Sequence, residues 1–149
     1  MRFTHHFTVR APLDAVAEFH RRSASMAQIT PPPVTIRFSS TPALLSEGST
    51  QQFTLGVGPL AIPWSARIDL LSPEAFVDRQ VKGPFRRWVH RHSFRELSPG
   101  LTEVEDRVEA ALPLHALWTP VALGMWLSLP LLFAYRGWKT RLLLETAGR

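Results

Sequence analysis

Residues 85–110 read FRRWVHRHSFRELSPGLTEVEDRVEA, and this stretch decides the fold. Every second residue of its first half is large and chemically distinctive, and a strand places such residues on one face: Trp88, His90, His92 and Phe94. A turn at Ser98-Pro99-Gly100 follows, and the second half continues the alternation in the same phase with Val104, Asp106, Val108 and Ala110. The stretch therefore predicts a β-hairpin with one distinctive face.

The register of this hairpin follows from the same alternation. An antiparallel pairing of Phe94 with Val104 sets His92 opposite Asp106. The other face carries charges of both signs, which is typical of a solvated sheet surface: Arg87, Arg91, Arg95, Glu103, Glu105 and Glu109. A histidine and a carboxylate beside Trp88 then face the interior, so function is to be sought on this inner face.

Length and composition limit the class of protein. With 149 residues, 45% of them apolar, the chain is expected to form one domain over residues 1–149. The sequence contains no cysteine, which excludes disulfides and cysteine zinc sites. The N-terminus, Met1-Arg2-Phe3-Thr4-His5-His6, lacks the apolar run of a secretory signal, so we expect a cytoplasmic protein.

The net charge of +5 invites a nucleic-acid interpretation, but the cations are dispersed. They lie in separate expected elements, at Arg21-Arg22, at Arg86-Arg87 and at Arg136, Lys139 and Arg141. No helix-turn-helix, RNA-binding aromatic motif or glycine-rich phosphate loop accompanies them. The sequence therefore predicts no specific binding of nucleic acid.

The chain before the hairpin reads as strands and short helices. Residues 2–10 alternate between apolar and polar side chains, as a half-buried strand does. Residues 12 to 28 repeat apolar residues at helical spacing until Pro31-Pro32-Pro33 ends the helical segment. Further alternation predicts strands over residues 34–39, 52–57, 64–70 and 75–82. With the hairpin, these make seven antiparallel strands, and the short helices lie between the first two.

The C-terminal quarter is unusually apolar. No Asp, Glu, Lys or Arg occurs in the 26 residues from Ala110 to Tyr135, a length that can span a bilayer. Prolines interrupt the segment, and Thr119-Pro120 has the form of a helix N-cap and first turn. Pro130 is expected to kink that helix or to restart it.

We predict one long amphipathic helix over residues 119–146 that lies on the sheet. Its apolar stripe consists of Leu131, Ala134, Tyr135, Trp138 and Leu142, and the opposite face carries Arg136, Lys139 and Thr140. Residues 112–129 are bulky and apolar, so they either fill one rim of the core or form a lip that touches a membrane. Membrane attachment through residues 110–135 is the alternative to a long helix that closes a soluble core.

Three segments carry a resemblance to a known family: residues 76–94, Glu105-Asp106-Arg107-Val108-Glu109, and Phe133-Ala134-Tyr135-Arg136. They resemble the Gly-Pro-Phe…Trp-x-His-x-His-x-Phe pattern of the polyketide cyclase/dehydrase-like branch of the START and birch-pollen-allergen (SRPBCC) superfamily. The resemblance implies an α+β helix-grip fold: a seven-stranded antiparallel sheet wrapped around a long C-terminal helix, with two short helices after strand 1. It also implies a cavity for lipids, polyketides, hormones or other hydrophobic molecules. Because members include binders, transporters and a few cyclases, the fold does not settle the activity.

The predicted function is the binding of a small hydrophobic ligand between the sheet and the last helix. The expected ligand-binding residues are Trp64, Gln80, Trp88, His90, His92, Phe94 and Asp106. The alternative is a cyclase or dehydratase that uses His90, His92 and Asp106 in acid–base catalysis. Whether Asp78 and Gln80 face inward depends on the register across Gly83-Pro84, since a slip of one residue reverses the face.

The same residues could also be the ligands of a metal ion. His90 and His92 with Asp106 offer two nitrogens and an oxygen, a set that occurs at open catalytic sites. The sequence places no third histidine beside them, however, and the arginine-rich neighbours disfavour a cation. We therefore predict neither a metal nor a cofactor. The oligomeric state is left open.

Overall fold

Seven strands form one antiparallel sheet in the order β1-β7-β6-β5-β4-β3-β2 in the computed structural model, which describes residues 1–147. Only the step from β1 to β2 leaves the sheet, and the two short helices α1 and α2 make that crossover. The elements are β1 (Arg2–Val9), α1 (Leu13–Arg21), α2 (Ser23–Gln28), β2 (Thr35–Ser40), β3 (Thr50–Val57), β4 (Leu60–Ser72), β5 (Ala75–Lys82), β6 (Arg87–Ser98), β7 (Leu101–Ala111) and α3 (Trp118–Ala147).

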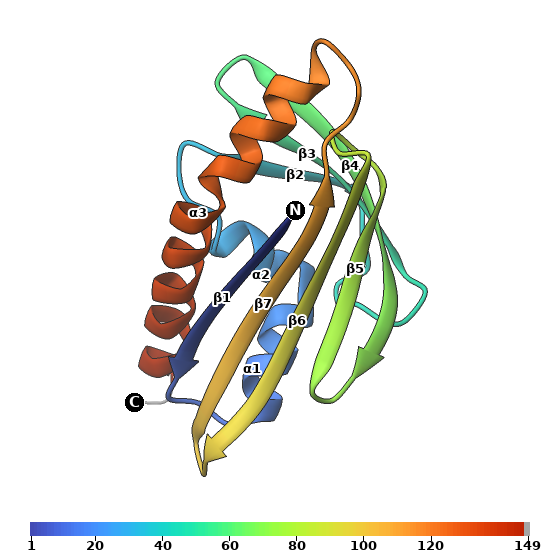
Figure 1. Cartoon of the computed structure of the whole chain (residues 1–149). Coiled ribbons are helices and arrows are strands. Elements are labelled where there is room, and N and C mark those ends of the chain that lie inside the picture. The colour runs from blue at the N-terminus through green and yellow to red at the C-terminus, as the bar shows by residue number, and fades with distance from the viewer. Residues whose placement is uncertain (148–149) are drawn as a thin grey trace.

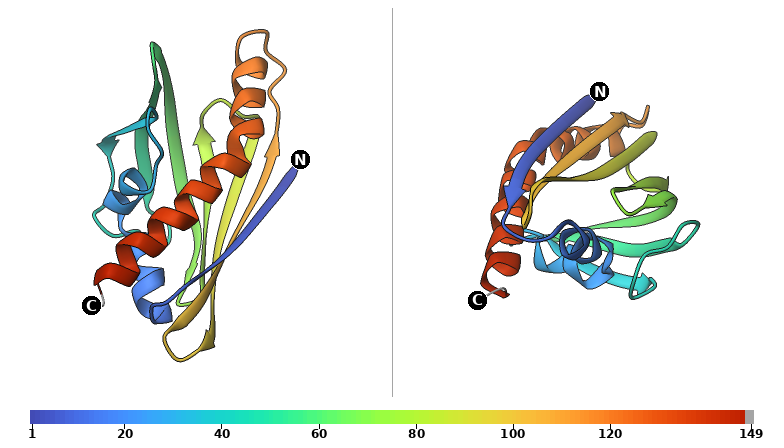
Figure 2. Two further views of the ribbon diagram at one scale, coloured as in Figure 1. Left: turned by 90° about the vertical axis from the view of Figure 1, so that its left-hand side faces the viewer. Right: turned by 90° about the horizontal axis from the view of Figure 1, so that it is seen from below.

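The sheet is strongly curved, and the helices lie on its concave side (Figure 1). Seen from below, the strands form an open half-barrel with α3 along one margin beside β1 (Figure 2). Helix α2 contacts β2 at the other margin, and α1 contacts β6 and β7. This arrangement is the helix-grip fold, and it confirms the architecture that the strand alternation and the long C-terminal helix predicted.

The β6–β7 hairpin has the predicted register. Phe94 pairs with Val104, and His92 pairs with Asp106. Gly100 closes the turn with a φ of 74°, a left-handed conformation that residues with a Cβ rarely adopt. The large side chains of β6 therefore point to the concave side, as the sequence predicted.

A β-bulge changes one prediction in β4. The alternation over residues 64–70 predicts Leu70 on the same face as Trp64 and Ile68, but in the structure its side chain is exposed. The pairing between β4 and β5 shifts between Ile68 and Leu70, which inverts the alternation after the bulge. Leu71 packs against the core in place of Leu70.

The face of α3 that packs inward is not the predicted stripe. Its buried residues are Ala122, Leu129, Phe133, Gly137 and Thr140. Leu131, Trp138 and Leu142, predicted to lie on the sheet, are exposed instead. The error has a physical cause: the packed side of the helix combines Leu129 and Phe133 with small and polar residues, so hydrophobicity alone selects the wrong face.

Gly137 explains why a small residue lies at this contact. A Cβ at this position would come within 3.2 Å of the Phe7 ring and within 3.4 Å of the His5 ring, both on β1. Thr140, one turn further along α3, is also fully buried. The helix backbone therefore approaches β1 closely at this point, which leaves no space for the large side chains of the predicted stripe.

Pro130 does not restart the helix, because α3 runs as one element from Trp118 to Ala147. The proline removes one backbone hydrogen bond, and helices commonly bend at such a residue. Figure 1 shows α3 changing direction part-way along its length. Among the described residues, α3 is also the one helix whose length and composition suffice to cross a bilayer.

Candidate functional site

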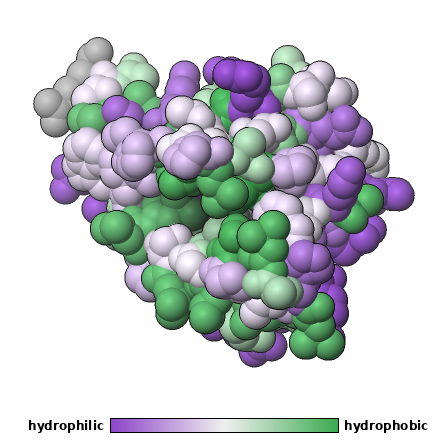
Figure 3. Space-filling view, turned by 90° about the horizontal axis from the view of Figure 1, so that it is seen from above, coloured by the Kyte–Doolittle hydropathy of each residue, from purple (hydrophilic) through white to green (hydrophobic). Residues whose placement is uncertain are grey.

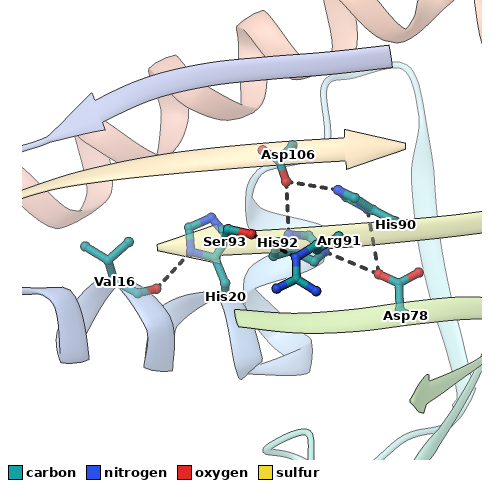
Figure 4. A network of polar contacts seen from close by, with 8 residues as sticks. All are labelled: Val16, His20, Asp78, His90, Arg91, His92, Ser93 and Asp106. Carbon is teal, nitrogen blue, oxygen red and sulfur yellow. Dashed lines mark hydrogen bonds and ion pairs between the residues drawn. The ribbon is translucent and has the colours of Figure 1, made fainter. Parts of the chain in front are cut away.

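A buried polar network lies on the concave side of the hairpin (Figure 4). Nε2 of His90 donates to Oδ1 of Asp106 at 2.9 Å, and Nδ1 of His92 lies 3.0 Å from the same oxygen. The His92 contact is an ion pair rather than a well-aligned hydrogen bond. The β6–β7 register creates the network, since it sets His92 directly opposite Asp106 and puts His90 two residues away on the same face.

Asp78 of β5 completes the network from the other side. Its Oδ2 atom lies 3.3 Å from Nε2 of His92 and 3.7 Å from Nδ1 of His90. The β5–β6 register pairs Asp78 with His90, which settles the question that Gly83-Pro84 left open and turns this carboxylate inward. Each imidazole ring thus lies between two carboxylates.

Burial and the carboxylates have opposite effects on the two histidines. Burial lowers the pKa of His92, but its contacts with Asp106 and Asp78 outweigh burial and raise that pKa to about 9. Burial lowers the pKa of His90, and the nearby charge of His92 lowers it further. Burial alone would raise the pKa of Asp106, yet both histidines hold it well below its usual value. The metal-free network at neutral pH therefore contains an imidazolium at His92 and a carboxylate at Asp106.

Stacking contacts fix the two rings in place. The His92 ring lies flat against Phe76, with centroids 4.2 Å apart and an interplanar angle of 19°. The His90 ring meets the Phe133 ring of α3 edge to face at 5.3 Å. Because aromatic packing and hydrogen bonds both restrain the rings, their nitrogens point in defined directions.

Two further basic side chains, His20 and Arg136, border this network. His20 of α1 donates from Nδ1 to the Val16 carbonyl at 2.8 Å, and burial together with the charge of His92 lowers its pKa to about 4. Arg136 of α3 is partly buried, and within residues 1–147 its Nε has no hydrogen-bond partner. Burial lowers the pKa of Arg136, an effect that the charges of Asp106 and Asp78 oppose. The helical periodicity predicted Arg136 on the face of the helix opposite the sheet.

The network borders a cavity of about 580 Å³ between the sheet and the helices. One part of its wall is polar and includes His20, Asp78, His90, His92 and Arg136. The remaining wall is mainly apolar and includes Met26, Phe53, Leu55, Trp64, Trp88, Met125, Leu129 and Leu132. From above, the surface is hollowed, and hydrophobic residues surround the hollow (Figure 3). A cavity of this size and character suits a small, largely apolar molecule.

The structure brings together four of the residues predicted to bind a ligand. Trp64, Trp88, His90 and His92 line the cavity, whereas Gln80, Phe94 and Asp106 lie outside its lining. Gln80 instead holds the turn before β6, because its Nε2 donates to the Phe85 carbonyl at 2.7 Å and its Oε1 accepts from the Phe85 amide. Phe94 belongs to the hydrophobic core, and Asp106 lies behind the histidines.

Three residues of this site were missed or left undecided by sequence reasoning. Asp78 was a weak candidate because its face depended on an unknown register. Arg136 followed the wrong assignment of the helix face, and His20 carried no signal of its own in a short helical segment. The spacing of Phe133 and Arg136, one turn apart, is the one local pattern that puts Arg136 beside a buried residue.

Comparison with solved structures places this fold among known ones. The chain is similar to the Zhui aromatase/cyclase from Streptomyces sp. R1128, with a TM-score of 0.79, 18% identity, and coverage of 100% of this chain and 96% of that one. A protein of Chromobacterium violaceum matches with a TM-score of 0.75, 13% identity, and coverage of 97% and 96%. The di-domain ARO/CYC BexL from the BE-7585A biosynthetic pathway matches with a TM-score of 0.66, 13% identity, and coverage of 95% and 45%. No family model and no curated protein sequence matches the chain.

The chain therefore has a helix-grip fold, shown by its strand order and long C-terminal helix and shared with these solved structures. The structural similarity to the two proteins described as aromatase/cyclases extends over nearly the whole length of this chain. Between its sheet and α3, the chain encloses the cavity described above.

Proposed function

We propose that this protein binds a small hydrophobic molecule that carries an oxygen-containing polar group. The observation that supports this most directly is the cavity of about 580 Å³, whose wall is mainly apolar and also includes the histidines, Asp78 and Arg136. Ligand sites of this kind combine a large apolar wall with a few convergent polar groups that orient the bound molecule. The cavity wall has both features.

Arg136 indicates which polar group the ligand carries. Its Nε faces no acceptor among the described residues, and a buried donor without a partner costs free energy. A guanidinium has only donors, so the group that pairs with it is an acceptor. A carbonyl or carboxylate oxygen on the ligand meets this requirement, while the hydrocarbon part occupies the apolar wall.

Native mass spectrometry of the protein purified without detergent tests this function. We expect a mass increment from a co-purified small molecule, or saturable binding of an anionic hydrophobic fluorophore such as anilinonaphthalene sulfonate to the emptied protein. Competition by a long-chain carboxylic acid should release the fluorophore. A folded preparation that shows neither a bound molecule nor saturable binding would contradict the proposal.

A second function is favoured by the exposed side of α3. Leu127, Leu131 and Trp138 lie on one side of the helix, with 70%, 77% and 53% of their surfaces exposed. No charged residue occurs between positions 110 and 135. We propose that this side, together with the exposed Leu114 and Leu117 before α3, lies on the surface of a lipid bilayer.

The position of the cavity supports a bilayer as the occupant of this surface. Leu131 is on the exposed side of α3 and also lines the cavity, together with Ser128 and Leu132. A hydrophobic ligand that enters beside Leu131 from a bilayer avoids crossing water. Lys139 lies next to this side of the helix, with its Nζ 5.8 Å from the centre of the Trp138 ring, a pairing suited to the headgroup region.

Contact with the bilayer surface is distinct from crossing it. Phe133, Gly137 and Thr140 on α3 are buried against the rest of the fold, so a crossing helix would have to leave its contacts with β1. Flotation with lipid vesicles tests the surface contact, and size-exclusion chromatography with light scattering identifies the competing occupant, a second copy of this chain.

A further inference from the structure

The histidines of the network each keep one ring nitrogen away from Asp106. Asp106 engages Nε2 of His90 and Nδ1 of His92. The remaining nitrogens, Nδ1 of His90 and Nε2 of His92, both turn towards Oδ2 of Asp78. One ligand atom from each of Asp78, His90 and His92 lies within 4.8 Å of the other two.

We propose that these three atoms bind one divalent first-row transition metal, such as Zn²⁺, Fe²⁺ or Co²⁺. Two imidazoles and one carboxylate form a common open site for such metals. Bonds of about 2.0–2.2 Å at tetrahedral or octahedral angles place neighbouring ligand atoms roughly 3.0–3.4 Å apart. The Asp78–His92 distance of 3.3 Å already meets this, and the Asp78–His90 distance of 3.7 Å requires a closure of a few tenths of an ångström.

Asp106 has the role of an outer partner in this arrangement. Histidines that bind a metal nearly always donate their other ring N–H to a carboxylate or carbonyl, which fixes the tautomer and the ring orientation. Asp106 accepts such a hydrogen bond from His90 at 2.9 Å and lies 3.0 Å from Nδ1 of His92 as an ion-pair partner. Because its side chain is buried behind the two histidines, it orients them without occupying the side that faces the cavity.

The charges around the site balance a divalent cation. Asp78 and Asp106 together supply two negative charges in direct contact with the two imidazoles. Arg136 and His20 also border the cavity, and Arg136 opposes a cation there. Within the described residues no ion pair joins Arg136 to either aspartate, whereas both carboxylates contact the imidazoles directly.

One side of the proposed site remains open. Asp78, His90 and His92 all line the cavity, so a water molecule or an oxygen of a bound ligand can complete the coordination. A metal in this position would act as a Lewis acid on a carbonyl group of that ligand. A metal was not predicted from the sequence because no third histidine lay beside the pair and the neighbours are rich in arginine; in the structure Asp78 of β5, and not Asp106, is the carboxylate grouped with the two histidines on the cavity side.

Titration of tag-free, chelator-treated protein with Co²⁺ and Zn²⁺ tests the site. We expect one equivalent of Co²⁺ to produce the visible ligand-field absorption of a nitrogen- and oxygen-ligated ion, and one equivalent of Zn²⁺ to displace it. Calorimetry should give the same stoichiometry. Absence of saturable binding of either ion to folded wild-type protein would overturn the proposal, whether or not the cavity binds a hydrophobic molecule.

Variants then locate the site. Asp78→Asn and His90→Ala should abolish the Co²⁺ spectrum, while Asp106→Asn should retain it with an affinity about 10–100-fold weaker. His6→Ala is the matched control, since His6 lies on the outer face of β1 beside Glu105. This variant should bind the ion with unchanged affinity. Asp78→Asn keeps the size of the side chain, so it tests the ligand set even where His90→Ala unfolds. Wild-type affinity in folded Asp78→Asn would overturn the assignment.

Discussion

Oδ1 of Asp106 lies 3.0 Å from Nδ1 of His92 across the β6–β7 pair, and both side chains are buried. The two residues are directly opposite in the register of the hairpin, so the contact is a consequence of strand alternation. His90 reaches the same oxygen from two residues away. One buried carboxylate therefore supports both histidines of the cavity wall.

Replacement of Asp106 by alanine should destabilise the protein. The change removes the carboxylate next to Nε2 of His90 and Nδ1 of His92, which costs about 1–3 kcal/mol in the free energy of unfolding. Urea denaturation of metal-free protein measures this difference. Glu103→Ala is the control, because Glu103 pairs with the exposed Arg95 and its loss should cost at most about 1 kcal/mol. Equal losses in the two variants would contradict the structural role of Asp106.

Replacement of Arg136 by methionine should weaken the binding of a carboxylate-bearing hydrophobic probe. The change removes a donor that faces the cavity while it keeps a side chain of similar length, so we expect affinity to fall roughly 10–100-fold. A neutral probe with the same hydrocarbon part should bind almost unchanged. Lys139→Met, which removes a cation from the same helix, serves as the control. If both probes lose affinity equally, Arg136 does not recognise the polar group.

The stability of the metal-free protein should decrease from pH 6.5 towards pH 4 through His20. Its pKa is lowered from 6.5 to about 4 on folding, so the unfolded chain binds more protons in this window. Stability therefore rises with pH there, and His20 accounts for up to about 3 kcal/mol of that rise. His20→Phe preserves the ring beside Phe94 and should flatten the curve between pH 4 and 6.5. An unchanged slope in this variant would assign the effect to other groups.

The sequence determined the parts of the site that depend on local alternation. The contact between His92 and Asp106 needs only the hairpin register, and a short turn with Gly100 fixes that register. The position of Asp78 depends on a longer connection through Gly83-Pro84, where a slip of one residue reverses the face. Local patterns do not fix such a register.

The side of α3 that faces the sheet could not be predicted from the sequence, for a reason other than strand register. Its inner side uses Gly137 and Thr140 where the backbone approaches Phe7, and its outer side exposes Leu131 and Trp138. Hydrophobic periodicity assigns the most hydrophobic side of a helix to the core, which is correct when the other side faces water. The inverted distribution on α3 is the expected one for a helix whose outer side meets an apolar environment.

A double variant, Leu127→Glu with Leu131→Glu, tests whether that environment is a bilayer. Both leucines are more exposed than buried, so the substitutions should leave the free energy of unfolding nearly unchanged. Transfer of a fully buried leucine side chain out of water contributes roughly 1.5–3 kcal/mol. Loss of two such contacts with lipid should therefore weaken binding to vesicles by at least about tenfold. Flotation with anionic vesicles and with neutral vesicles provides the measurement, and the anionic vesicles should bind more wild-type protein because the chain carries a net charge of +5.

Leu97→Glu is the matched control for this experiment. Leu97 is an exposed leucine near the end of β6, and Figure 1 shows that end of the hairpin far from the start of α3. Its substitution should leave vesicle binding unchanged, because the bilayer contact is assigned to one side of α3 and not to exposed leucines in general. Light scattering tests the competing explanation, a contact between two copies of the chain. In that case the wild-type protein is a dimer that does not bind vesicles, and the double variant is a monomer. This result would contradict the bilayer contact.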